Sequence, residues 1–446
     1  MLPETASSIG DRPAARTAYR GMNDETSALH DQVRQMVRRV FMIERETFQF
    51  DESAGEQILR HQLIVDPSSR LTGVFEGRLS IDSEAAYDQL DELFKSINHT
   101  PVFRQDGAKQ YIYAVTGRSN PPPRSATLNI ILFVVTVISV LMVGAELEIY
   151  HLASSNEAAL ALFDNFMLEI WRGFPYAASI LLILGAHEMG HYFAAKRHKL
   201  AVTLPYFIPA PPGIVPTFIG TFGAFIQLRA PIKNRKVLLD VGAAGPLIGL
   251  AFAVPILLIG LATSPVVAFE PGELYSLEGS SLLYALSKFI IFGRVLPSGV
   301  DDVFLNQLAQ AGWTGLLITA INLIPIGQLD GGHLLYSLLG GWARRLYYPM
   351  MLIILILGMI NITWMFWFIL LLLFGRLYAV PLDDITPLDP RRKFIAILGL
   401  FVFVVAFVPE PFRVFEAPTP GAVESVWLFP LMLGLVGLWT SRRLRR

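Results

Sequence analysis

Apolar segments long enough to cross a bilayer dominate the chain after residue 128, and they constrain the fold more than any other feature. Residues 1–128 carry 33 Asp, Glu, Lys and Arg residues, against 40 in the 318 residues that follow. Mean hydropathy is +0.48, too apolar for an ordinary soluble enzyme. The 36 basic and 37 acidic residues balance, so no nucleic-acid partner is expected. The fold class is therefore a polytopic α-helical membrane protein with a polar N-terminal part.

The polar part divides by composition. Residues 1–32 mix Pro, Gly, Ser and charges and predict a disordered tail. Residues 33–117 predict a small cytosolic α+β domain, because LTGVFEGRLSI alternates like a strand and SEAAYDQLDELFKSI has helical spacing. Asp106-Gly107 predicts a hairpin turn between two further strands. Residues 118–128 form a Pro-rich linker.

Residues 129–440 predict the membrane domain, with its core at 173–393 and a basic tail at 441–446. About eight transmembrane helices are expected, near residues 129–149, 173–195, 237–262, 311–327, 346–361, 364–380, 394–409 and 425–440. Lys and Arg concentrate in the loops that this count places inside, which predicts both termini in the cytosol. The first residues show neither a signal peptide nor a Ser/Arg-rich transit peptide, which favours a bacterial inner or plasma membrane.

The loop after the second span is apolar but broken by prolines and glycines (LPYFIPAPPGIVPTFIGTFGAFIQL). A regular spanning helix is excluded there, so the loop predicts a re-entrant or β-hairpin segment, with residues 221–228 extended. Such a strand, with Gly220 and Gly223, could bind an unwound substrate at its edge. The alternative is a packing loop.

The second span contains the motif HExxH, as His187-Glu188-Met189-Gly190-His191. Residues i and i+4 of a helix share a face, so both imidazoles can reach one Zn²⁺ while Glu188 acts as general base. The chain has no Cys, so a metal must bind to His, Asp or Glu. The alternative is a chance match with two core histidines, which the cost of ionisable groups in an apolar helix disfavours.

A catalytic zinc usually has three protein ligands, and Asp330 is the best candidate for the third. The alternatives for Asp330 are an ion-pathway residue or a helix cap. His333 either contacts a zinc-binding side chain without touching the zinc itself, or is simply a polar residue at the start of a helix. Asp240 opens an apolar span containing Ala-Ala-Gly-Pro, where we expect it to pair, cap or pack.

The HExxH motif is followed by Asn322-Leu-Ile-Pro325-Ile-Gly-Gln-Leu329-Asp330-Gly331. This pair resembles the signature of the site-2 protease family of intramembrane zinc metalloproteases, HExxH and NxxPxxxLDG. The runs GTFGAFIQLR and DDITPLDPRRK are similar to its plastid and cyanobacterial branch, the ethylene-dependent gravitropism-deficient and yellow-green (EGY) proteins.

The resemblance implies one Zn²⁺ per chain held by His187, His191 and Asp330, with Glu188 activating water and Asn322 near the scissile carbonyl. It implies regulated intramembrane proteolysis, in which membrane-spanning proteins are cleaved within the lipid bilayer. From position alone, residues 33–117 are expected to receive a cytosolic regulator. Two alternatives remain: a proton- or metal-ion-coupled transporter using the same buried groups, and a catalytically silent scaffold.

Overall fold

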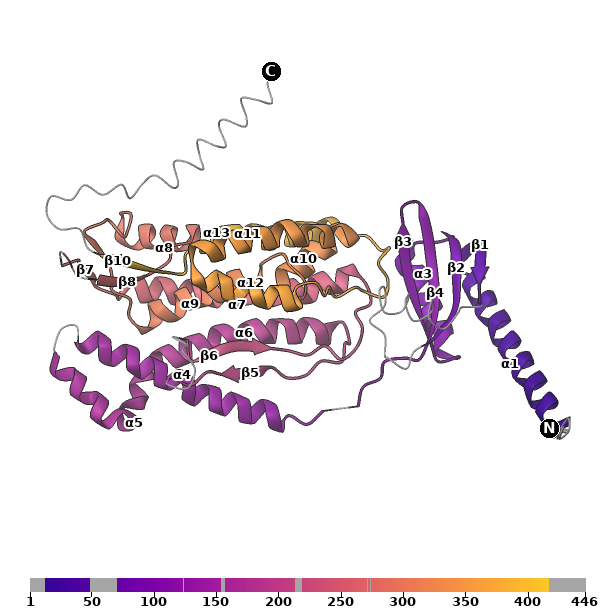
Figure 1. Cartoon of the computed structure of the whole chain (residues 1–446), viewed down its shortest axis with the longest axis horizontal. Coiled ribbons are helices and arrows are strands. Elements are labelled where there is room, and N and C mark those ends of the chain that lie inside the picture. The colour runs from indigo at the N-terminus through magenta and orange to yellow at the C-terminus, as the bar shows by residue number, and fades with distance from the viewer. Residues whose placement is uncertain are drawn as a thin grey trace, which may run out of the picture.

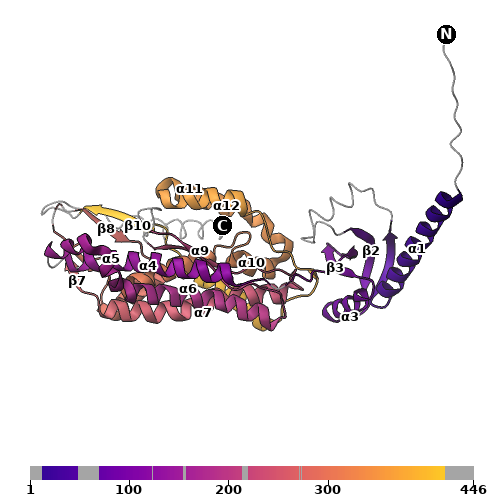
Figure 2. The ribbon, with the colours of Figure 1, turned by 90° about the horizontal axis from the view of Figure 1, so that it is seen from below.

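The computed structural model describes residues 13–48, 70–122, 124–153, 157–212, 219–270, 272 and 274–416. A small N-terminal α+β domain lies beyond one end of a long helical body, and two perpendicular views agree on this (Figures 1 and 2).

The N-terminal domain is an antiparallel sheet in the order β1-β2-β4-β3, with α1 and α3 packed on it. Its elements are α1 (Pro13–Arg38), β1 (Phe41–Thr47), β2 (Leu71–Leu79), α3 (Ser83–Lys95), β3 (His99–Asp106) and β4 (Lys109–Thr116). Asp82 is the N-cap of α3, because its carboxylate accepts hydrogen bonds from the N–H groups of Glu84 and Ala85. Gly107, at φ 58°, makes the predicted turn from β3 to β4.

The predicted tail differs from the structure. Helix α1 begins at Pro13, so most of the segment predicted as disordered is helical. Leu29 and Val33 lie four residues apart and both pack in the domain core. The i, i+4 spacing of these apolar residues indicates a helix, although charged residues surround them in the sequence.

Edge strand β3 ties the N-terminal domain to the helical body. The Phe103 N–H donates to the carbonyl of Leu382 (2.9 Å), and the Phe103 carbonyl accepts the N–H of Asp384 (3.2 Å). Asp383 donates in turn to the carbonyl of Lys233 (2.7 Å). Two loops of the helical body therefore extend the sheet of the N-terminal domain.

Long apolar helices form the helical body. They are α4 (Thr127–Ala153), α6 (Phe174–Arg197), α7 (Arg235–Ala262), α9 (Gln307–Asn322), α10 (Asp330–Leu339), α11 (Tyr347–Ile360), α12 (Ile362–Phe374) and α13 (Pro390–Ala406), with the short α5 (Phe166–Glu169) and α8 (Leu282–Phe292). By length and composition, four described stretches could cross a membrane: Thr127–Ala153, Ala159–Arg197, Arg235–Ala262 and Asp330–Ile360.

The predicted count of eight spans is not confirmed. Helices α9, α12 and α13 have only 13 to 17 residues. At 1.5 Å per residue they reach about 20–26 Å, less than the roughly 30 Å of hydrocarbon. The span predicted at 425–440 lies outside the described residues.

The loop between α6 and α7 forms a β-hairpin of β5 (Tyr206–Pro209) and β6 (Thr221–Phe225). It lies along α4 and α6 (Figure 1). Gly220 allows this close approach, since a Cβ there would stand 2.9 Å from the Cα of Val140 in α4. The hairpin thus brings extended backbone beside the helix that carries the HExxH motif.

Two small strand pairs and α8 close the end of the helical body opposite the N-terminal domain, where the sequence predicted only a loop. The strands are β7 (Val266–Ala268), β8 (Leu274–Glu278), β9 (Asp301–Val303) and β10 (Phe412–Glu416).

Candidate metal centre

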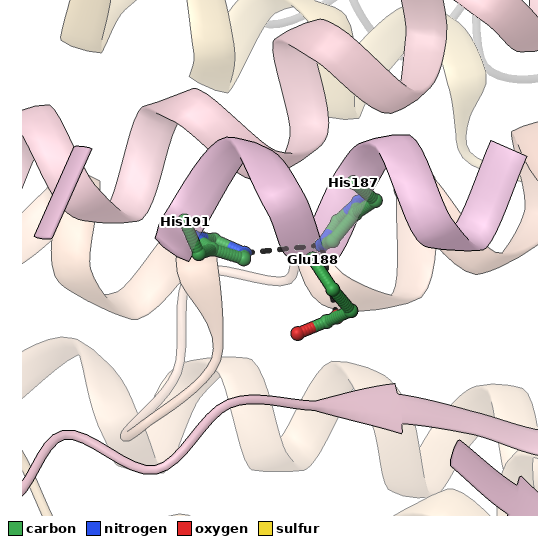
Figure 3. A group of neighbouring side chains, drawn as sticks. All are labelled: His187, Glu188 and His191. Atoms are coloured by element: carbon green, nitrogen blue, oxygen red, sulfur yellow. Dashed lines mark hydrogen bonds and ion pairs between the residues drawn. The ribbon is translucent and has the colours of Figure 1, made fainter. Parts of the chain in front are cut away.

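Helix α6 carries His187, Glu188 and His191, all buried in the helical body. The two imidazoles turn toward one another from successive turns, and their Nε2 atoms stand 3.1 Å apart (Figure 3). The three side chains form a cluster able to hold a metal ion. The i, i+4 spacing therefore produces the geometry expected of it.

Asp330, the first residue of α10, brings a carboxylate to the same point. Its Oδ2 lies 3.3 Å from Nε2 of His187 and 3.3 Å from Nε2 of His191. Ligand atoms bound at 2.0–2.1 Å around a tetrahedral Zn²⁺ are about 3.3 Å apart. Two imidazole nitrogens and one carboxylate oxygen therefore fit one zinc ion and leave its fourth position open.

A backbone carbonyl orients one of these side chains. His191 Nδ1 lies 2.7 Å from the carbonyl of Val241 in α7, which fixes the proton on Nδ1 and leaves Nε2 free to bind a metal. The Glu188 side chain lines the same cavity as Ile226, which follows β6. Its Oε1 stands 3.9 Å from Nε2 of His187, beside the three converging atoms.

A glycine face of α7 makes room for the imidazoles. A Cβ on Gly245 would lie 2.1 Å from Nε2 of His191, and one on Gly249 would lie 3.1 Å from Nδ1 of His187. Sequence reasoning missed both glycines and the Val241 carbonyl. The available signal was the run Gly-Ala-Ala-Gly-Pro, which was read only as a packing contact.

A cavity of about 240 Å³ opens onto the site. Its lining includes the predicted residues His187, Glu188, His191, Asn322, Asp330 and His333. It also includes Phe225 and Ile226, from the segment predicted to be extended, and the unpredicted Ile232. The Asn322 amide lies 3.5 Å from Nε2 of His187. His333 packs against Gly242 of α7, because a Cβ added to Gly242 would stand 2.8 Å from the Cβ of His333.

Gly220 and Gly223 are absent from the lining of this cavity. Gly220 faces α4, where its carbonyl accepts the Ser139 hydroxyl at 2.7 Å. Gly223 adopts φ 97°, and a Cβ there would meet nothing within 4 Å. The cavity wall is formed instead by the next residues of the hairpin, from Ala224 onward.

Comparison with known proteins bears out the motif-based resemblance. Residues 175–366 match the model of peptidase family M50. The chain is 32% identical to the probable zinc metalloprotease EGY2, chloroplastic, of Arabidopsis thaliana, over 57% of this chain and 44% of that protein. It is 28% identical to the probable zinc metalloprotease EGY1, chloroplastic, of Oryza sativa subsp. japonica, over 65% and 52%. No solved structure matches significantly.

Residues 175–366 thus form a peptidase family M50 domain related to the EGY zinc metalloproteases, and the buried His187, Glu188 and His191 could hold the metal ion that the sequence predicts. The chain spans about half the length of the curated relatives it matches. The predicted bacterial inner or plasma membrane is wrong, because these relatives are chloroplast proteins and point to a plastid membrane.

Proposed function

We propose that this chain, with its peptidase family M50 domain, is an intramembrane zinc endopeptidase that cleaves transmembrane segments of membrane proteins. The observation that carries the proposal is the convergence of His187, His191 and Asp330, whose ligand atoms lie 3.1 to 3.3 Å apart. These residues would hold the zinc, which when bound supplies a Lewis acid that polarises the scissile carbonyl and acidifies water.

The chain's own residues carry the protons. Glu188 is buried beside the three ligand atoms, with its Oε1 3.9 Å from Nε2 of His187. It takes the proton from the attacking water and delivers it to the leaving amide nitrogen. The Asn322 amide faces the same cavity, where it donates a hydrogen bond to the substrate carbonyl oxygen.

A helical substrate must unwind before cleavage, because its carbonyls are engaged in i to i+4 hydrogen bonds. The β-hairpin offers replacement partners, since β5 covers one edge of β6 and the end of β6, from Ala224 onward, lines the cavity. A substrate strand added to this backbone regains main-chain hydrogen bonds. Gly220 and Gly223 shape this strand, and the residues that follow contact the substrate.

The partners are therefore membrane-spanning substrates and the surrounding lipid. Apolar side chains exposed along α4, α11 and α12 suit such a setting, as Ile131, Ile356 and Ile369 illustrate. Cleavage at this site would release a soluble fragment on the side of the N-terminal domain, as in regulated intramembrane proteolysis.

The N-terminal domain would carry regulation, because strand β3 pairs with the loop that precedes α13, and this loop pairs in turn with the loop that precedes α7. A regulator that moves residues 33–117 would move the entrance of α7, where Ile232 lines the cavity. A chain lacking residues 1–117 should cleave with an altered rate or altered substrate choice. Identical behaviour in both respects would refute this regulatory role.

The proposed activity is tested by comparing membranes that contain wild-type protein or Glu188→Gln by quantitative proteomics. One or a few membrane-spanning proteins should accumulate intact only with the variant, although both proteins contain zinc. Glu146→Gln is the matched control, since Glu146 is also on a membrane helix but is absent from the cavity lining. Unchanged fragment levels with Glu188→Gln would reject Glu188 as the base.

A further inference from the structure

Asp240 joins three helices on the side of the N-terminal domain. It lies in the second turn of α7, and its Oδ1 and Oδ2 accept Nε (2.8 Å) and Nη2 (2.6 Å) of Arg392 in α13. Its Oδ2 also stands 2.8 Å from Nε2 of His198, the residue that ends α6. This bidentate contact between a guanidinium and a carboxylate fixes the orientation of the two side chains as well as the distance between them.

Each of the three helices serves the metal centre. Helix α6 carries both histidine ligands, and α7 supplies the Val241 carbonyl that holds the His191 imidazole at 2.7 Å. Helix α13 packs on α10, which begins with Asp330, and a Cβ on Gly399 of α13 would stand 2.2 Å from the Leu334 side chain. The junction therefore lies one residue from the carbonyl that fixes a ligand's orientation.

We propose that Asp240 is a positioning residue for the metal centre: it sets α7 against α6 and α13 so that the Val241 carbonyl meets His191. The role rests on the proposed ligand set of His187, His191 and Asp330. Asp240 itself contacts neither metal nor substrate. Loss of Asp240 should weaken metal binding by releasing the His191 ring. Groups that hold metal-binding side chains in place contribute about 10- to 100-fold to metal affinity.

The test measures the zinc dissociation constant of the purified full-length protein by competition with a chelator. Asp240→Asn preserves shape but removes the charge that holds Arg392 and His198. We expect its dissociation constant to rise about tenfold, with a changed Co²⁺ absorption spectrum reporting altered ligand geometry. The control is Asp389→Asn, which removes the other carboxylate on Arg392 (2.6 Å) and leaves the α7 contact in place. It should stay within about twofold of wild type.

Arg392→Lys provides a second, milder perturbation, because lysine keeps the positive charge but cannot form the bidentate contact with Asp240. It should weaken zinc binding less than Asp240→Asn, and it carries the test if Asp240→Asn fails to fold as a monodisperse protein. Wild-type affinity and an unchanged Co²⁺ spectrum in the folded variant would overturn the proposal. So would an equal loss in Asp389→Asn. A wild-type protein that binds no zinc would instead overturn the ligand set on which the role rests.

Discussion

The glycine face of α7 gives the sharpest test of how the metal centre is built. In Gly245→Ala the new methyl group would stand 2.1 Å from Nε2 of His191 and 2.5 Å from Cδ2 and Cε1 of the same ring. Normal contact needs about 3.5 Å. The ring must therefore move by about 1.4 Å, or α7 must withdraw by a similar distance.

This displacement exceeds what a metal centre tolerates, because ligands must be held within about 0.5 Å of productive geometry. Since His191 is itself a proposed ligand, we expect zinc affinity to fall by at least about 100-fold, with proteolysis lost. The fold should survive. Overpacking costs about 1–3 kcal/mol, and replacing a helical glycine by alanine returns about 1 kcal/mol.

The assay is chelator competition on purified protein, with thermal unfolding of the zinc-free form as a check on folding. Gly185→Ala is the matched control, because Gly185 lies in α6 two residues before His187 and a Cβ there meets nothing within 4 Å. It should bind zinc like the wild type. If Gly245→Ala also binds zinc normally, the tight packing of α7 on His191 is not what holds the ligand, and the reasoning fails.

Three other predictions concern the ligand set and the N-terminal domain. Asp330→Ala should lower zinc occupancy in purified protein by removing the third ligand; full occupancy would place that ligand elsewhere. Arg104→Ala should loosen the domain interface, because the guanidinium donates to the carbonyls of Pro381 (2.9 Å) and Leu382 (2.8 Å), and faster amide exchange in this loop would show it. The hydrogen bond from Lys236 lowers the pKa of Glu84, so this contact stabilises the interface above the ordinary carboxyl pKa and is lost as pH falls through the lowered value. Amide protection of the loop should therefore fall at acidic pH in the wild type, and a Glu84→Gln variant that kept the same pH dependence would contradict the assignment.

The sequence could predict what is local. Spacing i, i+4 on a helix places two imidazoles on one face whatever the rest of the fold does, so His187 and His191 were readable directly. Prolines and glycines excluded a regular helix at the hairpin. Asp330 as a zinc ligand depended on recognising a second motif, because no spacing rule connects residues 143 positions apart.

What the sequence could not predict depends on contacts across the chain. The Gly245 side of α7 and the partners of Asp240 are defined by which helices pack together, and Arg392 lies 152 residues from Asp240. The number of spans is unconfirmed for a related reason. A helix of 13 residues such as α12 looks apolar enough to span but is too short, and only its packing beside α11 shows how it is accommodated.

The packing around the metal centre also separates the protease from the transporter alternative. A transporter needs polar groups along a path that reaches both sides of the membrane. Toward the end opposite the N-terminal domain, an apolar layer follows His187, in which Ile183, Leu257, Trp313 and Leu316 are buried together. The charged group at that end, Lys288 with Glu278 and Asp302, is paired within itself. The cavity instead continues toward Ile232 and Gln328, near the N-terminal domain. A site open on one side and sealed by apolar packing on the other suits hydrolysis of a peptide bond and release of its product, whereas ion passage would require this packing to separate.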